Sequence, residues 1–234
     1  MFSKAKGAGE EKDRQGQPLA YQTGVQNFYG RDFLVTPDVL IPRPETEQMI
    51  DAVLNLVGKP YLPGVKPSVA KIGSKNLQIL DVGTGSGCIA ITLKLELPEA
   101  RVQALDISPA AILVAQKNAA KYGTPIPFII SNLLENVKFT PDLIVANLPY
   151  VDPEWDWLDR QALEYEPAIS LYAKNHGLAL ILDLIKQASR KGVKYLILEA
   201  DPCEHAEIEK FAKSQGFKLI ETRGFILTLY SPRG

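Results

Sequence analysis

The sequence is poor in cysteine, contains no long apolar run and carries no excess of charge of either sign. Two cysteines, Cys88 and Cys203, cannot build a disulfide framework, so we expect the protein to work in the reducing cytoplasm. No stretch approaches the ~18 uninterrupted apolar residues of a membrane-spanning helix. The first 17 residues mix Lys, Glu, Gly and Gln without the apolar core of a secretory signal, so neither secretion nor membrane insertion is expected.

The charges nearly cancel, with 26 basic and 27 acidic residues. Because nucleic-acid binding usually needs a basic domain or stripe, we expect no direct nucleic-acid partner. At 234 residues and 46% hydrophobic content, the chain is long enough for one domain with a sizeable core and a small additional segment.

We expect three parts along the chain. Residues 1–17 are polar and should form a disordered tail. Residues 18–75 should form an appendage that contains a hairpin, a helix and a linker. Residues 76–234 carry the regular alternation of strand and helix patterns and should form the main domain.

Within the appendage, aromatic and apolar residues interleaved with glycines predict a β-hairpin over residues 19–35. Pro44 suits the first turn of a helix, and an apolar stripe continues that helix to Gly58. Prolines and glycines then make residues 59–75 a linker.

In the main domain, strands and helices alternate. We expect strands near residues 77–82, 101–106, 126–130, 142–146, 194–199, 217–221 and 225–230, and helices near 87–97, 109–121, 177–190 and 203–215. Strands joined by helical crossovers predict a parallel sheet with helices on both faces. Only three residues separate the last two strands, so these must pair antiparallel. The expected fold is α/β and Rossmann-like, with a seven-stranded, mostly parallel sheet.

A glycine-rich loop follows the first of these strands. Gly83-Thr84-Gly85-Ser86-Gly87 leads into a helix whose N-terminal N–H groups can face a ligand. The glycines alternate as G-x-G-x-G, whereas a dinucleotide site needs G-x-G-x-x-G and a phosphate loop needs G-K-[ST]. Asp106, at the end of the next strand, can accept hydrogen bonds from both hydroxyls of a ribose. The pattern therefore favours a nucleoside without a pyrophosphate.

The tetrapeptide Asn147-Leu148-Pro149-Tyr150 stands where the apolar strand 142–146 ends. Pro149 disfavours the helical conformation for Leu148, so we expect the Leu148 carbonyl to be held extended. The Asn147 side-chain oxygen and this carbonyl can then accept both N–H bonds of a planar NH2 group, while Tyr150 supplies a flat face. Such a site can aim an amide or exocyclic base nitrogen for substitution, although the same residues also suit a plain strand-to-loop turn.

Three other clusters have simpler explanations. In Asp201-Pro202-Cys203-Glu204-His205, Asp at the N-cap, Pro at N1 and Glu at N3 predict a helix start rather than a metal site. Cys88 lies behind the glycine loop without an apparent base partner, so we expect it to pack. Trp155 and Trp157 suit a lid or plain packing better than a base-stacking platform.

The two motifs, together with Ile41-Pro42-Arg43-Pro44-Glu45-Thr46-Glu47, make the sequence resemble the HemK/PrmC family of S-adenosylmethionine-dependent methyltransferases. Further matches occur at residues 24–30 and 165–167, and the likeness covers roughly residue 18 to the C-terminus. Members of this family methylate the side-chain amide nitrogen (N5) of a glutamine in peptide chain release factors. The resemblance implies this activity, S-adenosylmethionine as cofactor, a release factor as partner and the class I methyltransferase fold.

The resemblance also implies roles for individual residues. The methionine end of the cofactor would contact the glycine loop and the strand before it, namely Asp81, Gly83, Thr84, Gly85, Ser86 and Gly87. Asp106 with Ile107 would hold the ribose, and Asn132 with Leu133 the adenine edge. The reacting amide would be held by Asn147, Leu148, Pro149 and Tyr150, with Asn147 also beside the cofactor. Apart from the resemblance, the residues themselves suggest that Arg43, Glu45 and Glu47 pair with the substrate, although favourable positions in a helix first turn explain the carboxylates equally well.

Three features depart from the family pattern. Leu148 stands where the family usually has Pro, which keeps the carbonyl but loses the rigidity of the ring. Asn132 stands where an acidic residue commonly meets the adenine amino group, and its amide oxygen can accept that bond without charge assistance. About 17 polar residues precede Pro18, where typical members have a helical domain that helps to hold the release factor. The resemblance therefore predicts the methyl-transfer chemistry more firmly than it predicts how the release factor is recognised.

Two other functions fit parts of the sequence. An N6-adenine methyltransferase of DNA or RNA grips a planar NH2 group with an Asn-Pro-Pro-Tyr-like motif, but the near-zero net charge and residues 41–47 argue against it. A non-catalytic S-adenosylmethionine-binding subunit would explain Leu148, but both Asn147 and Tyr150 are retained. We expect a monomer.

Overall fold

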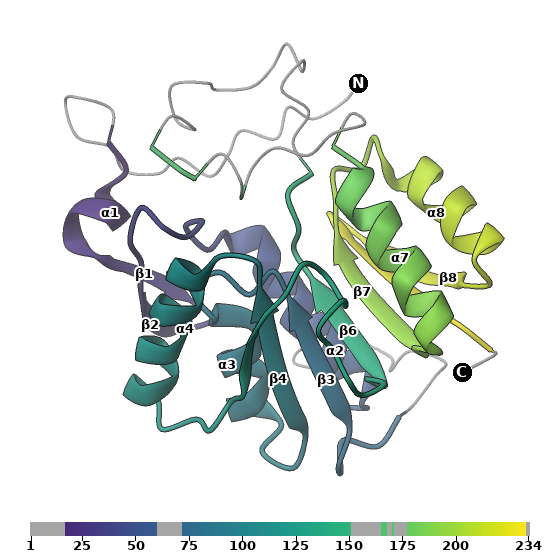
Figure 1. Ribbon diagram of the computed structural model, residues 1–234, viewed down its shortest axis with the longest axis horizontal. Helices are drawn as coiled ribbons and strands as arrows, with labels where there is room; N and C mark the ends of the chain where they lie inside the picture. The colour runs from purple at the N-terminus through teal and green to yellow at the C-terminus, as the bar shows by residue number, and fades with distance from the viewer. Residues whose placement is uncertain (1–16, 60–71, 151–164, 168–169, 171–176, 233–234) are drawn as a thin grey trace.

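A seven-stranded sheet with the strand order β5-β4-β3-β6-β7-β9-β8 runs through the centre of the molecule (Figure 1). The computed structural model describes residues 17–59, 72–150, 165–167, 170 and 177–232. The strands are β3 (Gln78–Val82), β4 (Arg101–Asp106), β5 (Phe128–Ile130), β6 (Leu143–Ala146), β7 (Tyr195–Glu199), β8 (Lys218–Arg223) and β9 (Ile226–Tyr230). Neighbours from β5 to β7 are parallel, whereas β9 is antiparallel to β7 and β8. The predicted sheet and its antiparallel C-terminal hairpin are confirmed.

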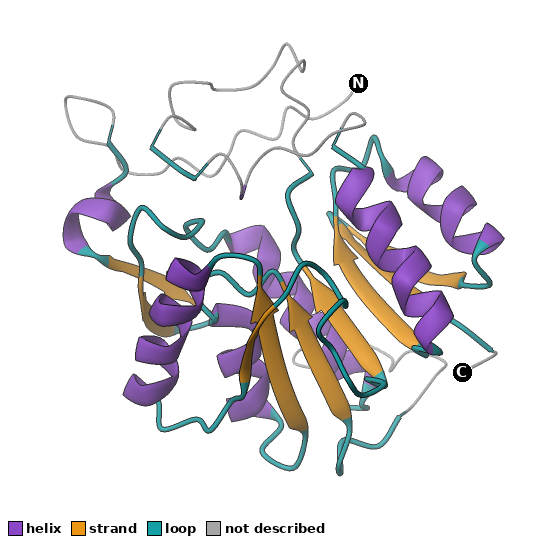
Figure 2. Ribbon diagram, in the orientation of Figure 1, coloured by secondary structure: helices purple, strands orange, loops and turns teal. Residues whose placement is uncertain are grey.

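Helices cover both faces of this sheet, as Figure 2 shows. They are α2 (Glu47–Leu56), α3 (Cys88–Glu96), α4 (Pro109–Lys121), α7 (Ala179–Lys191) and α8 (His205–Ser214). On one face, residues of α2 and α3 share a core with Ile79 of β3 and Val145 of β6. On the other face, residues of α7 and α8 share a second core with Leu80 and Ile144. Because successive strand residues enter opposite cores, β6 is apolar throughout and β7 is apolar up to its last residue, which explains the continuous apolar runs that predicted them.

The N-terminal part differs in one element from the expected hairpin. Residues 19–23 form a short helix, α1 (Leu19–Thr23), and only β1 (Val25–Phe28) and β2 (Arg31–Leu34) pair as antiparallel strands. The Thr23 hydroxyl donates to the Leu19 carbonyl at 3.1 Å, and Gly24, with φ +71°, ends the helix in the left-handed conformation. The strand expected at residues 19–23 is therefore wrong, and the hairpin begins after Gly24.

Helix α2 starts as expected from Pro44. A 3-10 turn, η1 (Pro44–Thr46), precedes the helix and has Pro at its first position. The helix ends at Leu56, and the N–H of Gly58 donates to the Asn55 carbonyl at 3.1 Å.

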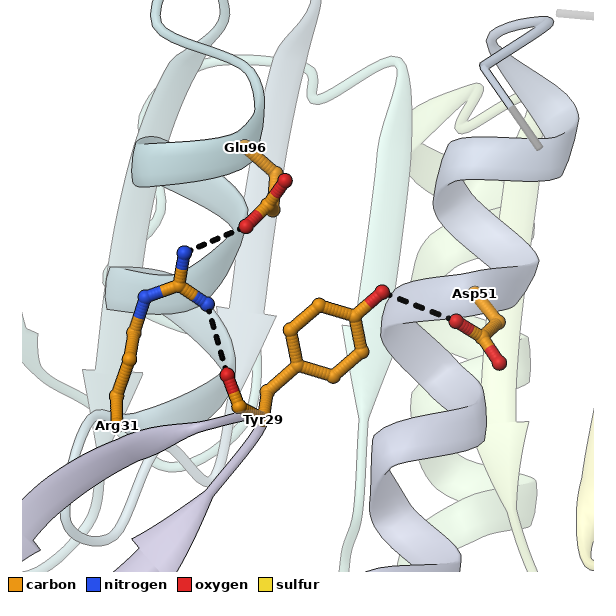
Figure 3. Close-up of polar contacts among 4 residues, drawn as sticks. All are labelled: Tyr29, Arg31, Asp51 and Glu96. Atoms are coloured by element: carbon orange, nitrogen blue, oxygen red, sulfur yellow. Dashed lines mark hydrogen bonds and ion pairs between the residues drawn. The ribbon is translucent and has the colours of Figure 1, made fainter. Parts of the chain in front are cut away.

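The hairpin β1-β2 packs on the same core as the sheet. Phe28 and Phe33 are fully buried in the cluster that also holds residues of α2 and α3. Polar contacts surround this apolar contact (Figure 3): the Tyr29 hydroxyl donates to Asp51 Oδ1 at 3.0 Å, and Arg31 pairs with Glu96 Oε1 at 2.5 Å. The hairpin is thus attached to α2 through Asp51 and to α3 through Glu96.

Asn118 of α4 joins the hairpin to the glycine-rich loop. It is fully buried, and its Oδ1 accepts the Leu34 N–H at 2.8 Å. Its Nδ2 donates to the Leu34 carbonyl at 3.0 Å and to the Ser86 carbonyl at 2.8 Å. One amide side chain therefore satisfies three backbone groups from two segments.

Helix α8 begins two residues later than expected. Residues 202–204 form a turn, and the helix starts at His205. The predicted capping bonds are nevertheless present, since Asp201 Oδ1 accepts the Cys203 N–H at 2.9 Å and the Asp201 N–H donates to Glu204 Oε2 at 3.2 Å. The side chains of Asp201 and Glu204 therefore stabilise the turn that precedes the helix.

Several predicted features lie outside the described residues. They are the tail up to residue 16, most of the linker 59–75, and Trp155 and Trp157. In the part of the chain that the structure describes, no helix has both the length and the apolar character needed to cross a bilayer.

Asn118→Ala is expected to lower the free energy of unfolding by about 2–4 kcal/mol, because buried backbone groups of Leu34 and Ser86 lose their partner. Chemical denaturation followed by circular dichroism measures the change. Asn27→Ala is the control, since it removes an exposed bond to Asp32 and should change stability by less than ~0.5 kcal/mol. Equal losses in both variants would contradict the role of Asn118.

Candidate active site

The carboxyl ends of β3, β4, β6 and β7 meet at one edge of the sheet. Strands β3 and β6 are parallel neighbours, with Val82 paired to Ala146, while β4 and β7 lie on their outer sides. The order of the strands therefore reverses between β3 and β6, which is the place where parallel α/β sheets bind ligands. The glycine loop and Asn147 both leave the sheet at this point.

Gly83 allows the two segments to approach closely. Its φ is +75°, and a Cβ at this position would lie 2.9 Å from Leu148 Cδ2 and 3.7 Å from the Asn147 carbonyl oxygen. A side chain at residue 83 would therefore be strained in its backbone and would have to displace the end of the Leu148 side chain. Leu148 itself is buried, and its side chain joins the core under α7.

Backbone hydrogen bonds hold the glycine loop to β4. The N–H groups of Gly83 and Thr84 both donate to the Leu105 carbonyl at 2.9 Å. Gly85 has φ +53° and open space where a Cβ would stand, so its backbone can approach a ligand. Gly87, with φ +81°, is the N-cap of α3.

Asp81 lies fully buried beneath this loop. Its Oδ2 accepts the Thr84 hydroxyl at 2.6 Å and the Ala90 N–H at 3.2 Å. Burial raises the pKa of the Asp81 carboxyl to about 7, although both hydrogen bonds oppose the shift. Its Oδ1 has no hydrogen-bond partner among the described residues. Asp81 thus shapes the loop, and its second oxygen fits a polar group such as the amino-acid end of S-adenosylmethionine.

Asp106 also supports the loop. Its two carboxylate oxygens accept the N–H groups of Gly85 and Ser108, each at 2.9 Å. Burial raises the pKa of the Asp106 carboxyl against the lowering effect of these bonds. Since a carboxylate offers about four acceptor positions, Asp106 can still accept hydrogen bonds from the two hydroxyls of a ribose.

Two exposed apolar side chains flank the predicted adenine site. Ile107 follows β4 and Ile130 ends β5, and both are about half exposed, at 51% and 52%. Asn132 is exposed and donates through Nδ2 to Glu135 Oε1 at 2.8 Å, so its amide oxygen is the end left for an adenine amino group. Leu133 has a φ of +45°. The structure therefore brings the predicted adenine residues to the end of β5, next to Asp106.

Asn147 is held by a residue from the segment before α2. Its Nδ2 donates to the Thr46 hydroxyl oxygen at 3.0 Å. This bond uses the donor end of the amide, so the acceptor end, Oδ1, is turned away from Thr46. That is the orientation that reading an NH2 group requires.

Tyr150 is held at its hydroxyl. The hydroxyl donates to Glu199 Oε1, at the end of β7, at 3.2 Å. Burial raises the pKa of the Glu199 carboxyl to about 7, and hydrogen bonding from Thr46 and Tyr150 opposes the shift. Behind the tetrapeptide, Gly177 has φ +91°, and a Cβ there would overlap the Tyr150 carbonyl. The Tyr150 hydroxyl is thus bound to the end of β7, and its carbonyl lies close against Gly177.

Arg43 and Glu45, the predicted substrate contacts, lie beside this site. Arg43 pairs with Glu166 Oε1 at 2.5 Å, and the Glu166 side chain is completely buried. Burial raises the pKa of the Glu166 carboxyl, whereas the charge of Arg43 lowers it. Glu45 is half-buried, and its charge acts on Glu199. The Arg43 guanidinium therefore already has a carboxylate partner within the protein.

Sequence reasoning missed the contributions of Thr46, Glu166 and Glu199. Thr46 and Glu166 stood inside matched motifs without a role, because nothing local shows what they contact. The sequence could have indicated a role for Glu199, because this charged residue ends the otherwise apolar strand β7. Strand β7 is the neighbour of β6, which ends just before Asn147.

The comparisons with known proteins agree with this geometry. Residues 69–158 match the family model of the methyltransferase small domain. A methylase of ribosomal protein L11 from Lactobacillus delbrueckii subsp. bulgaricus has a TM-score of 0.54 at 24% identity, covering 87% of both chains. A methyltransferase from Pyrococcus furiosus has a TM-score of 0.61 at 14% identity, covering 90% of this chain and 93% of that one. These structures show the class I methyltransferase fold.

Three curated relatives carry the same name, release factor glutamine methyltransferase. The protein of Koribacter versatilis is 44% identical over 175 residues, which are 74% of this chain and 58% of the relative. The protein of Neisseria gonorrhoeae is 36% identical over 88% of this chain and 71% of its own length. That of Flavobacterium psychrophilum is 34% identical over 91% and 70%. The chain thus spans between about three fifths and seven tenths of these relatives, and it belongs to the release factor glutamine methyltransferase family.

Proposed function

We propose that the protein transfers the methyl group of S-adenosylmethionine to the side-chain amide nitrogen of a glutamine in a peptide chain release factor. The observation that carries the proposal is the orientation of Asn147, whose donor end is bound to Thr46 while its acceptor end remains for a substrate NH2 group. The names of the relatives support the release factor as substrate. The nearly balanced charge of the chain supports a protein rather than a nucleic-acid substrate.

The cofactor site follows the edge of the sheet from β3 to β5. The glycine loop and Asp81 Oδ1 would face the methionine end, Asp106 the ribose, and Ile107, Asn132 and Leu133 the adenine. When bound there, S-adenosylmethionine supplies a methyl group made electrophilic by its sulfonium charge. The close approach of Gly83 and Leu148 supports a site in which cofactor and amide lie next to each other.

The amide substrate needs positioning more than acid or base catalysis. An amide nitrogen is a poor nucleophile because its lone pair is delocalised into the carbonyl. Asn147 Oδ1 and the Leu148 carbonyl would accept both of its N–H bonds and hold the lone pair in line with the methyl group. Good alignment of two reactants can contribute ~7–11 kcal/mol to lowering a barrier. As the nitrogen gains the methyl group, the sulfur–methyl bond would break and a neutral thioether would leave. The amide proton becomes acidic in the same step and would pass to water, so no general base is required.

Asp106→Ala is expected to weaken S-adenosylmethionine binding at least about tenfold, because charge-assisted bonds to the ribose are worth ~1.5–3 kcal/mol. Isothermal titration calorimetry measures the affinity, and thermal unfolding checks that the fold survives. Asp142→Ala is the matched control, since Asp142 also accepts a backbone N–H, from Gln78, but at the start of β6 and far from the site. Unchanged affinity in Asp106→Ala would remove this residue from the cofactor site.

Asn147→Ala is expected to lower kcat about a hundredfold or more with little change in cofactor affinity, since it removes an acceptor that aligns the reacting nitrogen. Incubation with isotope-labelled S-adenosylmethionine and a release factor, followed by mass spectrometry of the glutamine, gives the rate. Asn27→Ala, on the exposed hairpin, is the control. Wild-type turnover in Asn147→Ala, or wild-type protein that labels adenine in nucleic acid and no glutamine, would overturn the proposed function.

A further inference from the structure

The glycine-rich loop holds a conformation that its own residues do not enforce. Gly83, Gly85 and Gly87 have positive φ values of +75°, +53° and +81°. Because glycine adopts many backbone conformations at similar cost, such a loop needs contacts from outside to stay in one of them. The inference that follows concerns those contacts, and it rests on the proposed function only in that S-adenosylmethionine binds at this loop.

The Ser86 carbonyl lies where helix α3 would begin one residue earlier. In an α-helix the Ala90 N–H would donate to this carbonyl, which is four residues before it. Here the Ala90 N–H donates to Asp81 Oδ2 at 3.2 Å, and the helical pattern begins with the Ile91 N–H bound to the Gly87 carbonyl at 2.9 Å. Since Ser86 is only 2% exposed, its carbonyl needs a partner from another part of the protein.

Asn118 of α4 is that partner. It is fully buried, and its Nδ2 donates to the Ser86 carbonyl at 2.8 Å. The Leu105 carbonyl and the Asp106 carboxylate bind N–H groups of the loop, whereas Asn118 binds one of its carbonyl groups. Without Asn118, the Ser86 carbonyl would regain the Ala90 N–H as its nearest donor along the chain, and α3 would extend into the loop.

Leu34, at the end of β2, determines which end of the Asn118 amide faces the loop. Its N–H donates to Asn118 Oδ1 at 2.8 Å, and its carbonyl accepts from Nδ2 at 3.0 Å. A backbone N–H only donates, so it requires the amide oxygen, and Nδ2 is then the end that reaches Ser86. The hairpin itself is anchored by the buried rings of Phe28 and Phe33. The hairpin therefore sets the position of the Ser86 carbonyl through one side chain.

We propose that Asn118 is a positioning residue of the cofactor site: it holds the Ser86 carbonyl out of α3 and joins it to the β1-β2 hairpin, which keeps the glycine loop in the conformation that receives S-adenosylmethionine. Helix α4 lies directly against the end of this loop, since a Cβ at Gly87 would be 3.1 Å from Ala115 Cβ. Asn118 is fully buried, so it acts on the ligand through the loop and not by contact. The hairpin, which lies outside the large sheet, thereby contributes to cofactor affinity.

The first test measures cofactor affinity by isothermal titration calorimetry, at a temperature at which thermal unfolding shows each variant to be native. Asn118→Leu keeps the size of the side chain but removes its donors and its acceptor, and it should raise the Kd for S-adenosylmethionine at least about tenfold. Asn118→Ala should raise the Kd in the same direction. Leu184→Ala is the matched control: Leu184 is fully buried in α7, in the core on the other face of the sheet from α3. Its loss should destabilise the fold comparably and leave the Kd within about twofold of the wild type.

The kinetics of the same variants separate positioning from stability. In Asn118→Leu the KM for S-adenosylmethionine should rise with the Kd, whereas kcat at saturating cofactor should stay within about twofold of the wild type, because a filled site holds the loop in place. A role in stability alone would change neither constant in the native protein. A fall in kcat with an unchanged KM would contradict the proposed role.

The second test observes the loop without cofactor or substrate. Amide hydrogen exchange over residues 83–90 should be faster in Asn118→Leu than in Leu184→Ala, because only the first variant releases the loop. In wild-type protein, the side-chain 15N resonance of Asn118 should shift when S-adenosylmethionine is added, and this measurement needs no variant to fold. Equal exchange in the two variants, or a resonance that does not move at saturation, would overturn the positioning role.

Cofactor affinity also distinguishes this inference from the proposed function, because it requires no release factor. If wild-type protein binds S-adenosylmethionine but methylates no release-factor glutamine, the proposed function fails, and the affinities of the Asn118 variants still decide the positioning role. If wild-type protein methylates the glutamine and Asn118→Leu binds the cofactor with wild-type affinity, the positioning role fails and the proposed function stands. Equal weakening in Leu184→Ala would likewise overturn the positioning role.

Discussion

The parallel pairing of β3 with β6 is the contact on which the whole site depends. It sets the glycine loop beside Asn147, because the two strands run in the same direction and end at the same edge of the sheet. The other features of the site depend on this contact between β3 and β6. Gly83 adopts a φ that favours glycine at the point where the loop meets Leu148. The strands on either side end in Asp106 and Glu199, one for each half of the site.

Buried carboxylates support both halves. Asp81 shapes the glycine loop from below, and Glu199 holds the hydroxyl of Tyr150. Burial raises the pKa of each to about 7, so their ionisation responds strongly to nearby charge. A cationic ligand bound above them would favour the ionised form of both. The ionisation of both acids is therefore linked to the charge of what the site binds.

The sheet could be predicted from sequence because its central strands are buried on both faces and are separated by glycines and helical patterns. Residues 19–23 were misread as strand because the aromatic and polar alternation there is ambiguous, and Gly24 rather than the pattern fixes the helix end. The glycine loop, Asp106 and the tetrapeptide were visible as local motifs. The contacts of Thr46 and Glu199 were not, because Thr46 lies 101 residues from Asn147 and Glu199 lies 49 from Tyr150. The pairing of β6 with β7 brings Glu199 to Tyr150, whereas Thr46 reaches Asn147 from the 3-10 turn before α2.

Gly177 has a consequence for any attempt to redesign the specificity of this enzyme family. At this position the first carbon atom of any side chain would collide with the Tyr150 carbonyl. Because every residue other than glycine carries a Cβ, every replacement makes this collision, whatever its charge, polarity or size. Mutant libraries that aim to reshape the substrate pocket would gain by diversifying other neighbours of the tetrapeptide and by keeping residue 177 constant.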